Sequence, residues 1–156
     1  MPRMTLPAEG SCRCGALRFR VTEPPILTAA CHCTGCQKMS GSAFSTTAMI
    51  PAAGFEVIAG TPVVGGLKGA DIHHQHCPDC LSWVFTTLGP ELPFVNLRAV
   101  MLDDTAWFAP FTETCTSEML PWARTGALRS YEKFPPPEAF SALMAEFAEF
   151  YARSED

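Results

Sequence analysis

The segment Cys31-His32-Cys33-Thr34-Gly35-Cys36 decides how this chain is interpreted, together with Cys12-Arg13-Cys14 and Cys77-Pro78-Asp79-Cys80. The three clusters contain all of the cysteines except Cys115. Thiols one or two residues apart bridge one another poorly, but they readily occupy neighbouring corners of a tetrahedron around zinc. The spacing therefore predicts metal sites, and it disfavours the alternative of an oxidised, secreted disulfide framework.

Seven clustered cysteines do not divide into groups of four, so we expect two different sites. The two-cysteine clusters together predict a closed, structural zinc site, whose ligands are Cys12, Cys14, Cys77 and Cys80. The remaining cluster predicts a three-ligand zinc site, whose ligands are Cys31, Cys33 and Cys36. A fourth position left open to water or substrate is typical of a catalytic zinc, and such a metal is expected to be the more labile of the two.

The fourth ligand of the three-cysteine site has several candidates. An exchangeable position is our first expectation, and closure by a histidine just before Cys77 or by Cys115 is the alternative; these histidines are His73, His74 and His76. His32 is a weaker candidate, because on an extended segment it points away from its cysteine neighbours. In a purely structural interpretation the three histidines are half-exposed strand residues and Cys115 is a small buried apolar residue.

Composition restricts the possible classes of protein. The chain has 156 residues, of which 47% are hydrophobic and 17% charged, which suits one well-buried domain. Its net charge of −5 and scattered basic residues argue against a nucleic-acid partner. The amino terminus lacks the apolar run of a secretory signal, and no segment is apolar enough to span a membrane, so we expect a cytoplasmic protein with no membrane association.

Prolines and glycines divide most of the chain into short apolar pieces, which predicts a mainly β fold. Leu17, Phe19 and Val21 alternate with arginines, as in a half-buried strand. Further strands are expected at Ile26 to Cys31, Ala43 to Ile50, Phe55 to Ile58, Ile72 to His76, Trp83 to Leu88 and Phe94 to Val100. We therefore expect a zinc-binding β domain over residues 1–136.

Residues 137–156 are expected to form a C-terminal amphipathic helix, with its helical part from about Pro137 to Ala152. Its apolar residues recur every three or four positions: Phe140, Leu143, Met144, Phe147, Phe150 and Tyr151. This stripe should pack on the same domain or on a second copy of the chain, which leaves a homo-oligomer open.

With these residues in view, the chain resembles the glutathione-dependent formaldehyde-activating enzyme family, which has an Mss4-like zinc-binding β fold. The similar motifs are Gly10-Ser11-Cys12-Arg13-Cys14-Gly15 with Ala16 to Phe19, the Cys31 to Cys36 segment followed by Gly41-Ser42-Ala43-Phe44, Cys77 to Cys80, Leu102-Asp103, and Pro121-Trp122. The resemblance covers residues 9 to 125. It implies short antiparallel sheets stapled by zinc, and the same structural and catalytic cysteine sets as the spacing.

The resemblance also implies a reaction. The family joins formaldehyde to glutathione to give S-hydroxymethylglutathione, a carbon–sulfur lyase reaction in reverse, so the expected substrate is a small thiol such as glutathione. The chain departs from the family pattern at two positions. Leu81 replaces a glycine that commonly follows the last zinc cysteine, and Glu113 stands where many relatives have a histidine.

Substrate contacts are only weakly indicated by the sequence. Candidates for carboxylate binding are Lys38, Arg124 and Arg129, candidates for a pocket lining are Trp107, Phe108 and Trp122, and candidate proton carriers are Asp103, Asp104 and Glu113. An enzyme acting on a thiol or thiol adduct is the leading hypothesis. The alternatives are a non-catalytic, zinc-stabilised binding module with two structural metals and a redox or zinc-reservoir protein.

Overall fold

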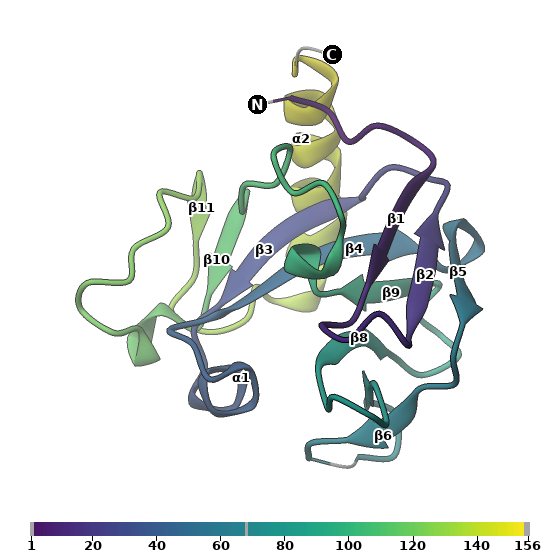
Figure 1. The fold of residues 1–156 in the computed structure, drawn as a ribbon. Coiled ribbons are helices and arrows are strands. Elements are labelled where there is room, and N and C mark those ends of the chain that lie inside the picture. Colours follow the sequence, from purple (N-terminus) through teal and green to yellow (C-terminus); the bar gives the residue numbers. More distant parts are fainter. Residues whose placement is uncertain (1, 68, 155–156) are drawn as a thin grey trace.

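Short strands joined by proline and glycine turns dominate the molecule (Figure 1). The computed structural model describes residues 2–67 and 69–154. A three-stranded antiparallel sheet has the order β1 (Ala8–Ser11), β2 (Arg18–Val21), β5 (Phe55–Ala59). The expectation of a mainly β fold is therefore confirmed.

A larger sheet carries most of the remaining strands. In the described residues its order is β11 (Arg129–Ser130), β10 (Thr112–Thr114), β3 (Leu27–Cys31), β4 (Ser45–Pro51), β9 (Phe94–Leu97), β8 (Trp83–Thr87), β7 (His73–His76), β6 (Val63–Gly65). Two α-helices, α1 (Thr34–Ser40) and α2 (Phe140–Ala152), accompany short 3-10 helices at Ala52–Gly54, Ala99–Met101, Thr116–Glu118 and Pro137–Ala139.

The larger sheet is mixed: antiparallel pairing predominates, as expected, and two pairs in the described residues are parallel. β10 runs parallel to both β3 and β11, whereas the other pairs in this sheet are antiparallel. Parallel neighbours need a long crossover, because a two-residue hairpin can join only antiparallel strands. Here the chain travels from the end of β9 through residues 98–111 before β10 begins beside β3.

The centre of the larger sheet has an apolar layer on each face. On one face, Phe19 and Val21 of the small sheet pack with Ala48, Ile50 and Leu97. This burial confirms the half-buried strand that the alternating pattern predicted. On the other face lies α2, which crosses β3 and β4 in Figure 1. β4 is therefore covered on both sides.

Helix α2 packs through the residues that its periodicity indicated. Leu143 and Phe147, which are 3% and 1% exposed, contact a cluster that includes Leu27, Met49 and Phe111. The α-helix begins at Phe140, because the first three residues of the predicted segment form a 3-10 turn after the proline run. The last two residues of the expected C-terminal segment lie outside the described residues.

Helix α1 was not predicted. Its first turn is capped by Cys33, whose Sγ accepts a hydrogen bond of 3.3 Å from the Cys36 N–H, and its end is capped by Gly41 in the left-handed region (φ 61°). None of its residues is buried, so the sequence contains no apolar stripe from which this helix could be inferred.

Replacing Phe147 with alanine should destabilise the protein by about 3–5 kcal/mol, because it removes a fully buried ring from the α2 cluster. Chemical denaturation of wild type and variant measures this difference. Glu149→Ala, on the exposed face of the same helix, is the matched control and should change stability by less than about 0.5 kcal/mol. Equal stability of the two variants would show that α2 does not support the sheet.

Candidate metal centres

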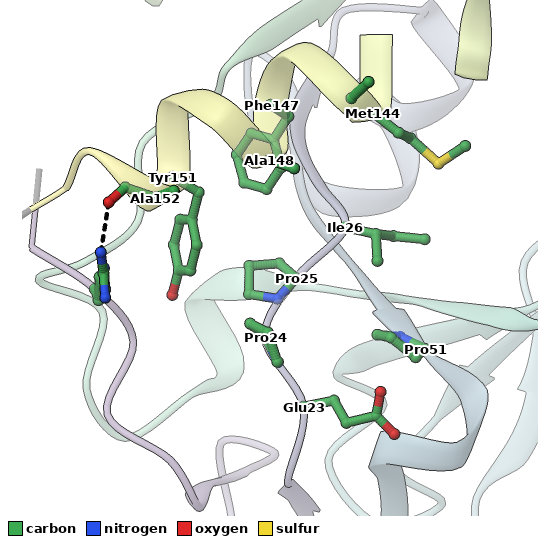
Figure 2. A pocket seen from close by; sticks show the side chains of 12 residues that line it. Glu23, Pro24, Pro25, Ile26, Pro51, Met144, Phe147, Ala148, Tyr151 and Ala152 are labelled. Carbon is green, nitrogen blue, oxygen red and sulfur yellow. Dashed lines mark hydrogen bonds between the residues drawn. The ribbon is translucent and has the colours of Figure 1, made fainter. Parts of the chain in front are cut away.

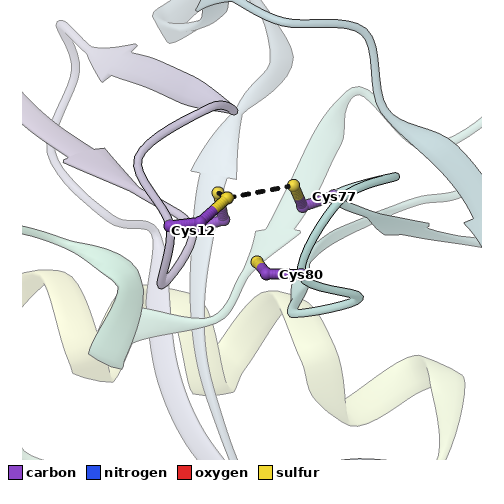
Figure 3. Close-up of side chains that lie close together, drawn as sticks. Cys12, Cys77 and Cys80 are labelled. Atoms are coloured by element: carbon purple, nitrogen blue, oxygen red, sulfur yellow. Dashed lines mark hydrogen bonds between the residues drawn. The ribbon is translucent and has the colours of Figure 1, made fainter.

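Four cysteines from distant parts of the chain form the first centre. Their Sγ atoms all lie within 4.8 Å of one another: Cys12, Cys14, Cys77 and Cys80. Two of the separations are 3.5 Å, between Cys12 and Cys14, and 3.7 Å, between Cys14 and Cys77. Figure 3 shows the labelled sulfurs turned toward a common point.

These separations distinguish a metal centre from a disulfide. A disulfide needs sulfurs about 2.05 Å apart, and all of these cysteines are free. Zinc–sulfur bonds of about 2.3 Å in a tetrahedron place the sulfurs about 3.8 Å from one another. The first centre therefore fits a metal ion bound by four cysteine sulfurs.

Hydrogen bonds orient the thiols of the first centre. The Leu17 N–H donates to Cys12 Sγ over 3.3 Å, and Ser82 Oγ lies 3.2 Å from Cys80 Sγ. The interaction with Ser82 lowers the pKa of the Cys80 thiol to about 5. Donors of this kind favour thiolates, which is the state in which sulfur binds metals.

Leu81 adopts the left-handed conformation that explains the family preference for glycine at this position. Its φ is 58°, and its N–H donates to the Cys77 carbonyl over 3.0 Å, which closes the turn between the two cysteines. A side chain in this region costs on the order of 1 kcal/mol. Leu81 is 68% exposed, so its side chain points into solvent and the backbone strain is its main cost.

The second centre lies where β3 passes into α1. Cys31 ends the strand, Cys33 caps the helix and Cys36 lies in its first turn, with the three Sγ atoms within 4.8 Å of one another. Within the described residues, no fourth ligand atom belongs to this group. The Cys36 thiol lowers the pKa of Cys31 to about 5, while the reciprocal interaction and burial raise the pKa of Cys36. One thiolate is thus stabilised by its neighbour.

Cys115 approaches this centre without joining it. It follows β10, whose Thr114 is paired with Cys31, and it is buried. Burial and the neighbouring Cys31 and Cys33 thiolates raise the pKa of the Cys115 thiol to about 12. None of the three histidines of β7 belongs to either sulfur group. Instead, His74 Nδ1 lies 2.9 Å from Thr86 Oγ1.

His32 and Glu113 form a buried pair on the opposite face of the sheet. His32 Nε2 lies 3.3 Å from Glu113 Oε2, and the Thr125 hydroxyl donates to the same oxygen over 2.9 Å. Alternation along β3 explains why His32 faces away from Cys31 and Cys33, as expected. Glu113 consequently contacts the imidazole, and its carboxylate lies on the face of the sheet opposite the thiols.

An apolar cavity of about 250 Å³ opens beside Cys31, between the sheet and α2. Its sheet side is formed by Ala29, Cys31, Thr47, Asn96 and Thr112. Its opposite side includes Phe134, Phe140 and Leu143. Two buried atoms at this cavity, Asn96 Oδ1 and Thr112 Oγ1, have no hydrogen-bond partner. The cavity therefore offers an apolar volume with a few polar groups near a thiol, which is the usual character of a small-molecule site.

A second cavity, of about 460 Å³, lies on the α1 side and is lined by several hydroxyl groups and by Arg98. The sequence candidates for substrate binding lie elsewhere. Arg129 is paired with Glu146, Lys38 and Arg124 are exposed, and Trp122 is 76% exposed. Sequence reasoning missed Arg98 and Asn96, although both stand on one face of an otherwise apolar strand segment.

The aromatic and acidic candidates have structural roles. Trp107 is buried in the core, with Phe108 packed against it edge to face. Asp104 accepts a hydrogen bond of 2.9 Å from the Ala106 N–H, which is a turn cap, and Asp103 lies 3.6 Å from Arg18. None of these residues lines either cavity beside the second centre.

Figure 2 shows a third hollow, an apolar groove of about 600 Å³ between α2 and the Pro24-Pro25 turn. The Arg3 guanidinium donates to the Ala152 carbonyl at one end of it. Its lining contains no cysteine or histidine, so it has no part in the chemistry of the two centres.

Glu113→Gln should remove a pH dependence of stability. Burial opposes ionisation of Glu113, but hydrogen bonds from Thr125 outweigh it and hold the pKa below its usual value. The carboxylate therefore stabilises the fold above about pH 4.5, and this contribution is lost as pH falls through the lowered pKa. We expect a destabilisation of about 1–3 kcal/mol at pH 7 that shrinks below pH ~4.

Urea denaturation of the wild type and the variant between pH 3 and 7 measures this difference, with the exposed Glu149→Gln as the control. A difference between wild type and Glu113→Gln that stays constant over this range would contradict an ionised, buried Glu113.

Comparison with known proteins agrees with the arrangement of cysteines. The family described as "Glutathione-dependent formaldehyde-activating enzyme" matches residues 7–118. Two similar proteins carry the name "Putative glutathione-dependent formaldehyde-activating enzyme". The protein from Halomonas elongata is 35% identical over 101 residues, which cover 56% of this chain and 63% of the relative. The protein from Sordaria macrospora is 28% identical over 102 residues, which cover 61% of this chain and 43% of the relative.

The match thus spans less than two thirds of either relative's length. A crystal structure of a Rhodobacter sphaeroides protein is similar over 61% of this chain and 87% of that chain, with a TM-score of 0.48 and 17% identity. No helix in the described part of the chain has the length and apolar character needed to cross a membrane. The family match covers well over half of the residues and includes all three cysteine clusters, so the chain belongs to the glutathione-dependent formaldehyde-activating enzyme family.

Proposed function

We propose that the protein is a zinc-dependent carbon–sulfur lyase-like enzyme acting on a thiol or thiol–aldehyde adduct such as S-hydroxymethylglutathione. The observation that carries this proposal is the three-sulfur centre beside a cavity that Cys31 itself lines. Family membership and the names of the relatives support the choice of substrate class. The free cysteines favour a thiol-reducing compartment such as the cytoplasm.

The two centres have different roles in this proposal. Cys12, Cys14, Cys77 and Cys80 hold a structural zinc that joins the turn after β1 to the turn before β8. Cys31, Cys33 and Cys36 would hold the second zinc and would leave a position for the substrate. When bound there, zinc supplies a place for a substrate thiolate and a Lewis acid for an aldehyde oxygen.

In the reaction, a bond forms between the thiol sulfur and the aldehyde carbon, and the thiol proton passes to the carbonyl oxygen. The reverse direction breaks the same bond. The apolar cavity holds the carbon part of the adduct and excludes water from it. Because the cavity lining contains hydroxyl groups, among them that of Thr114, but no carboxylate or imidazole, hydroxyl groups carry the proton.

Cys115 is the observation that favours a second candidate, a binding module with two structural metals. It is buried and its thiol interacts with those of Cys31 and Cys33, so a movement of its sulfur into this group would close the second centre. A four-thiolate centre has no position for a substrate. The candidates therefore differ in whether Cys115 binds the metal.

Cys80→Ser should reduce the zinc content from two ions per chain to one and lower the melting temperature strongly, because a structural zinc supplies on the order of 10 kcal/mol of folding free energy. Elemental analysis and thermal denaturation measure both effects. A variant that binds one zinc but melts like wild type would argue against a structural first centre.

Cys33→Ser should abolish turnover of glutathione with formaldehyde and leave the fold and the first zinc in place. Zinc stoichiometry, circular dichroism and an adduct assay measure these properties. Cys115→Ser is the matched control and should retain both zinc and turnover, because Cys115 lies outside the sulfur group. Loss of the second metal in Cys115→Ser, or full activity in Cys33→Ser, would favour the binding module.

A further inference from the structure

Arg98 is a buried cation without a carboxylate partner in the described residues. It directly follows β9 and is 6% exposed, and no carboxylate forms an ion pair with it there. Burying an unpaired charge is costly, so buried arginines are normally matched by an anion. The burial also lowers the pKa of Arg98 to about 10, which still leaves it charged at neutral pH.

The guanidinium is held in place but keeps donors free. Its central carbon, Cζ, lies 4.2 Å from the centre of the Trp83 ring, and one terminal nitrogen donates to the Asn96 carbonyl over 3.2 Å. The Nε–H has no hydrogen-bond partner. Trp83 and Asn96 thus fix the orientation of the group, and the buried Nε–H is not used within the protein.

The cavity that Arg98 lines has the composition of an anion site. Its volume is about 460 Å³, and its lining contains hydroxyl groups from Ser40, Ser42, Ser45 and Ser82 but no carboxylate. The Ser45 hydroxyl is buried, has no nitrogen or oxygen partner, and interacts with the Cys36 thiol. Charged guanidinium groups bind carboxylates with paired, charge-assisted hydrogen bonds, and neighbouring hydroxyls can add to them.

This cavity adjoins the second metal centre. Ser45 lines the cavity and is the cross-strand partner of Cys31, and the sulfur groups of Cys36 and Cys31 favour the charged form of Arg98. No hydrogen bond joins the guanidinium to a sulfur in the described chain, so its donors are not used by the thiolates. A thiol bound at the centre can therefore extend a short acidic arm toward Arg98.

We propose that this cavity is the carboxylate subsite for the thiol substrate, with Arg98 as the residue that binds the carboxylate. The proposal rests on the function proposed above, because it takes the thiol to lie at the second centre. It divides the substrate between two cavities. The carboxylate-bearing thiol part lies against Arg98, and the aldehyde-derived part lies in the apolar cavity beside Cys31.

Binding of S-methylglutathione to the zinc-loaded protein tests this proposal without any turnover. This probe keeps both carboxylates of glutathione and has no free thiol. Isothermal titration should show that Arg98→Gln weakens its binding by ~10- to 100-fold, the loss expected for a charge-assisted hydrogen-bonded contact. The diethyl ester of the same probe, which lacks both carboxylates, should bind wild type and variant equally weakly.

Three controls separate this role from support of the fold. Arg124→Gln removes an equal charge from the exposed surface and should bind the probe like wild type. Arg98→Lys keeps the charge and should retain part of the affinity. Arg98→Met replaces the buried charge with an apolar side chain of similar length, so it should fold at least as stably as wild type while losing the carboxylate contact.

Two results would overturn the proposal. One is equal probe affinity in wild type and Arg98→Gln. The other is a loss of the second zinc in Arg98→Gln, together with an equal loss of affinity for S-methylglutathione and for its diethyl ester. This result would mean that Arg98 balances the charge of the thiolates and does not bind a carboxylate. Arg98-dependent binding in a protein that turns over no thiol–aldehyde adduct would leave the carboxylate subsite standing and refute the lyase function alone.

Discussion

The register of β3 between β4 and β10 is the constraint on which the rest of the site depends. Leu27, Ala29 and Cys31 lie on the face toward α2, and the buried Thr28 and Ala30 alternate to the opposite face, where the Thr28 hydroxyl donates to the Ala109 carbonyl. Cross-strand pairing then places Ser45 and Thr114 on either side of Cys31. A slip by one residue would exchange the two faces, and it would bury the thiol among core side chains while turning His32 toward the helix.

The same register separates two kinds of electrostatic environment. On one face, His32 and Thr125 contact Glu113, so this carboxylate has its partners within the protein, whereas His32 Nδ1 is buried without one. On the other face, Arg98 is buried without a carboxylate near a group of thiols. A carboxylate paired within the protein is typical of structural support, whereas a buried cation without a carboxylate beside a cavity is typical of a ligand site. The difference allows the two faces to be assigned different tasks.

Sequence spacing was sufficient to group the seven clustered cysteines, because zinc geometry restricts which thiols can share one ion. It also located α2 and the central strands, whose apolar periodicity reflects burial on a definite face. The short helix α1 buries nothing, and the parallel pairing of β10 is a contact between segments about eighty residues apart, so neither has a local signal. Arg98 could not be singled out from the sequence, since only the fold shows that it is buried beside a cavity and lacks a carboxylate partner.

The two sulfur groups differ in how much chain must be ordered before they exist. Cys31, Cys33 and Cys36 are joined by one strand end and one helical turn, whereas Cys14 and Cys77 are 63 residues apart. Closing the longer loop costs more conformational entropy and requires that both sheets be nearly assembled. During synthesis, the local group would therefore be complete first and would capture metal early. The distant group would bind its metal only as the last hairpins dock, so the order of metal loading would report the order of folding.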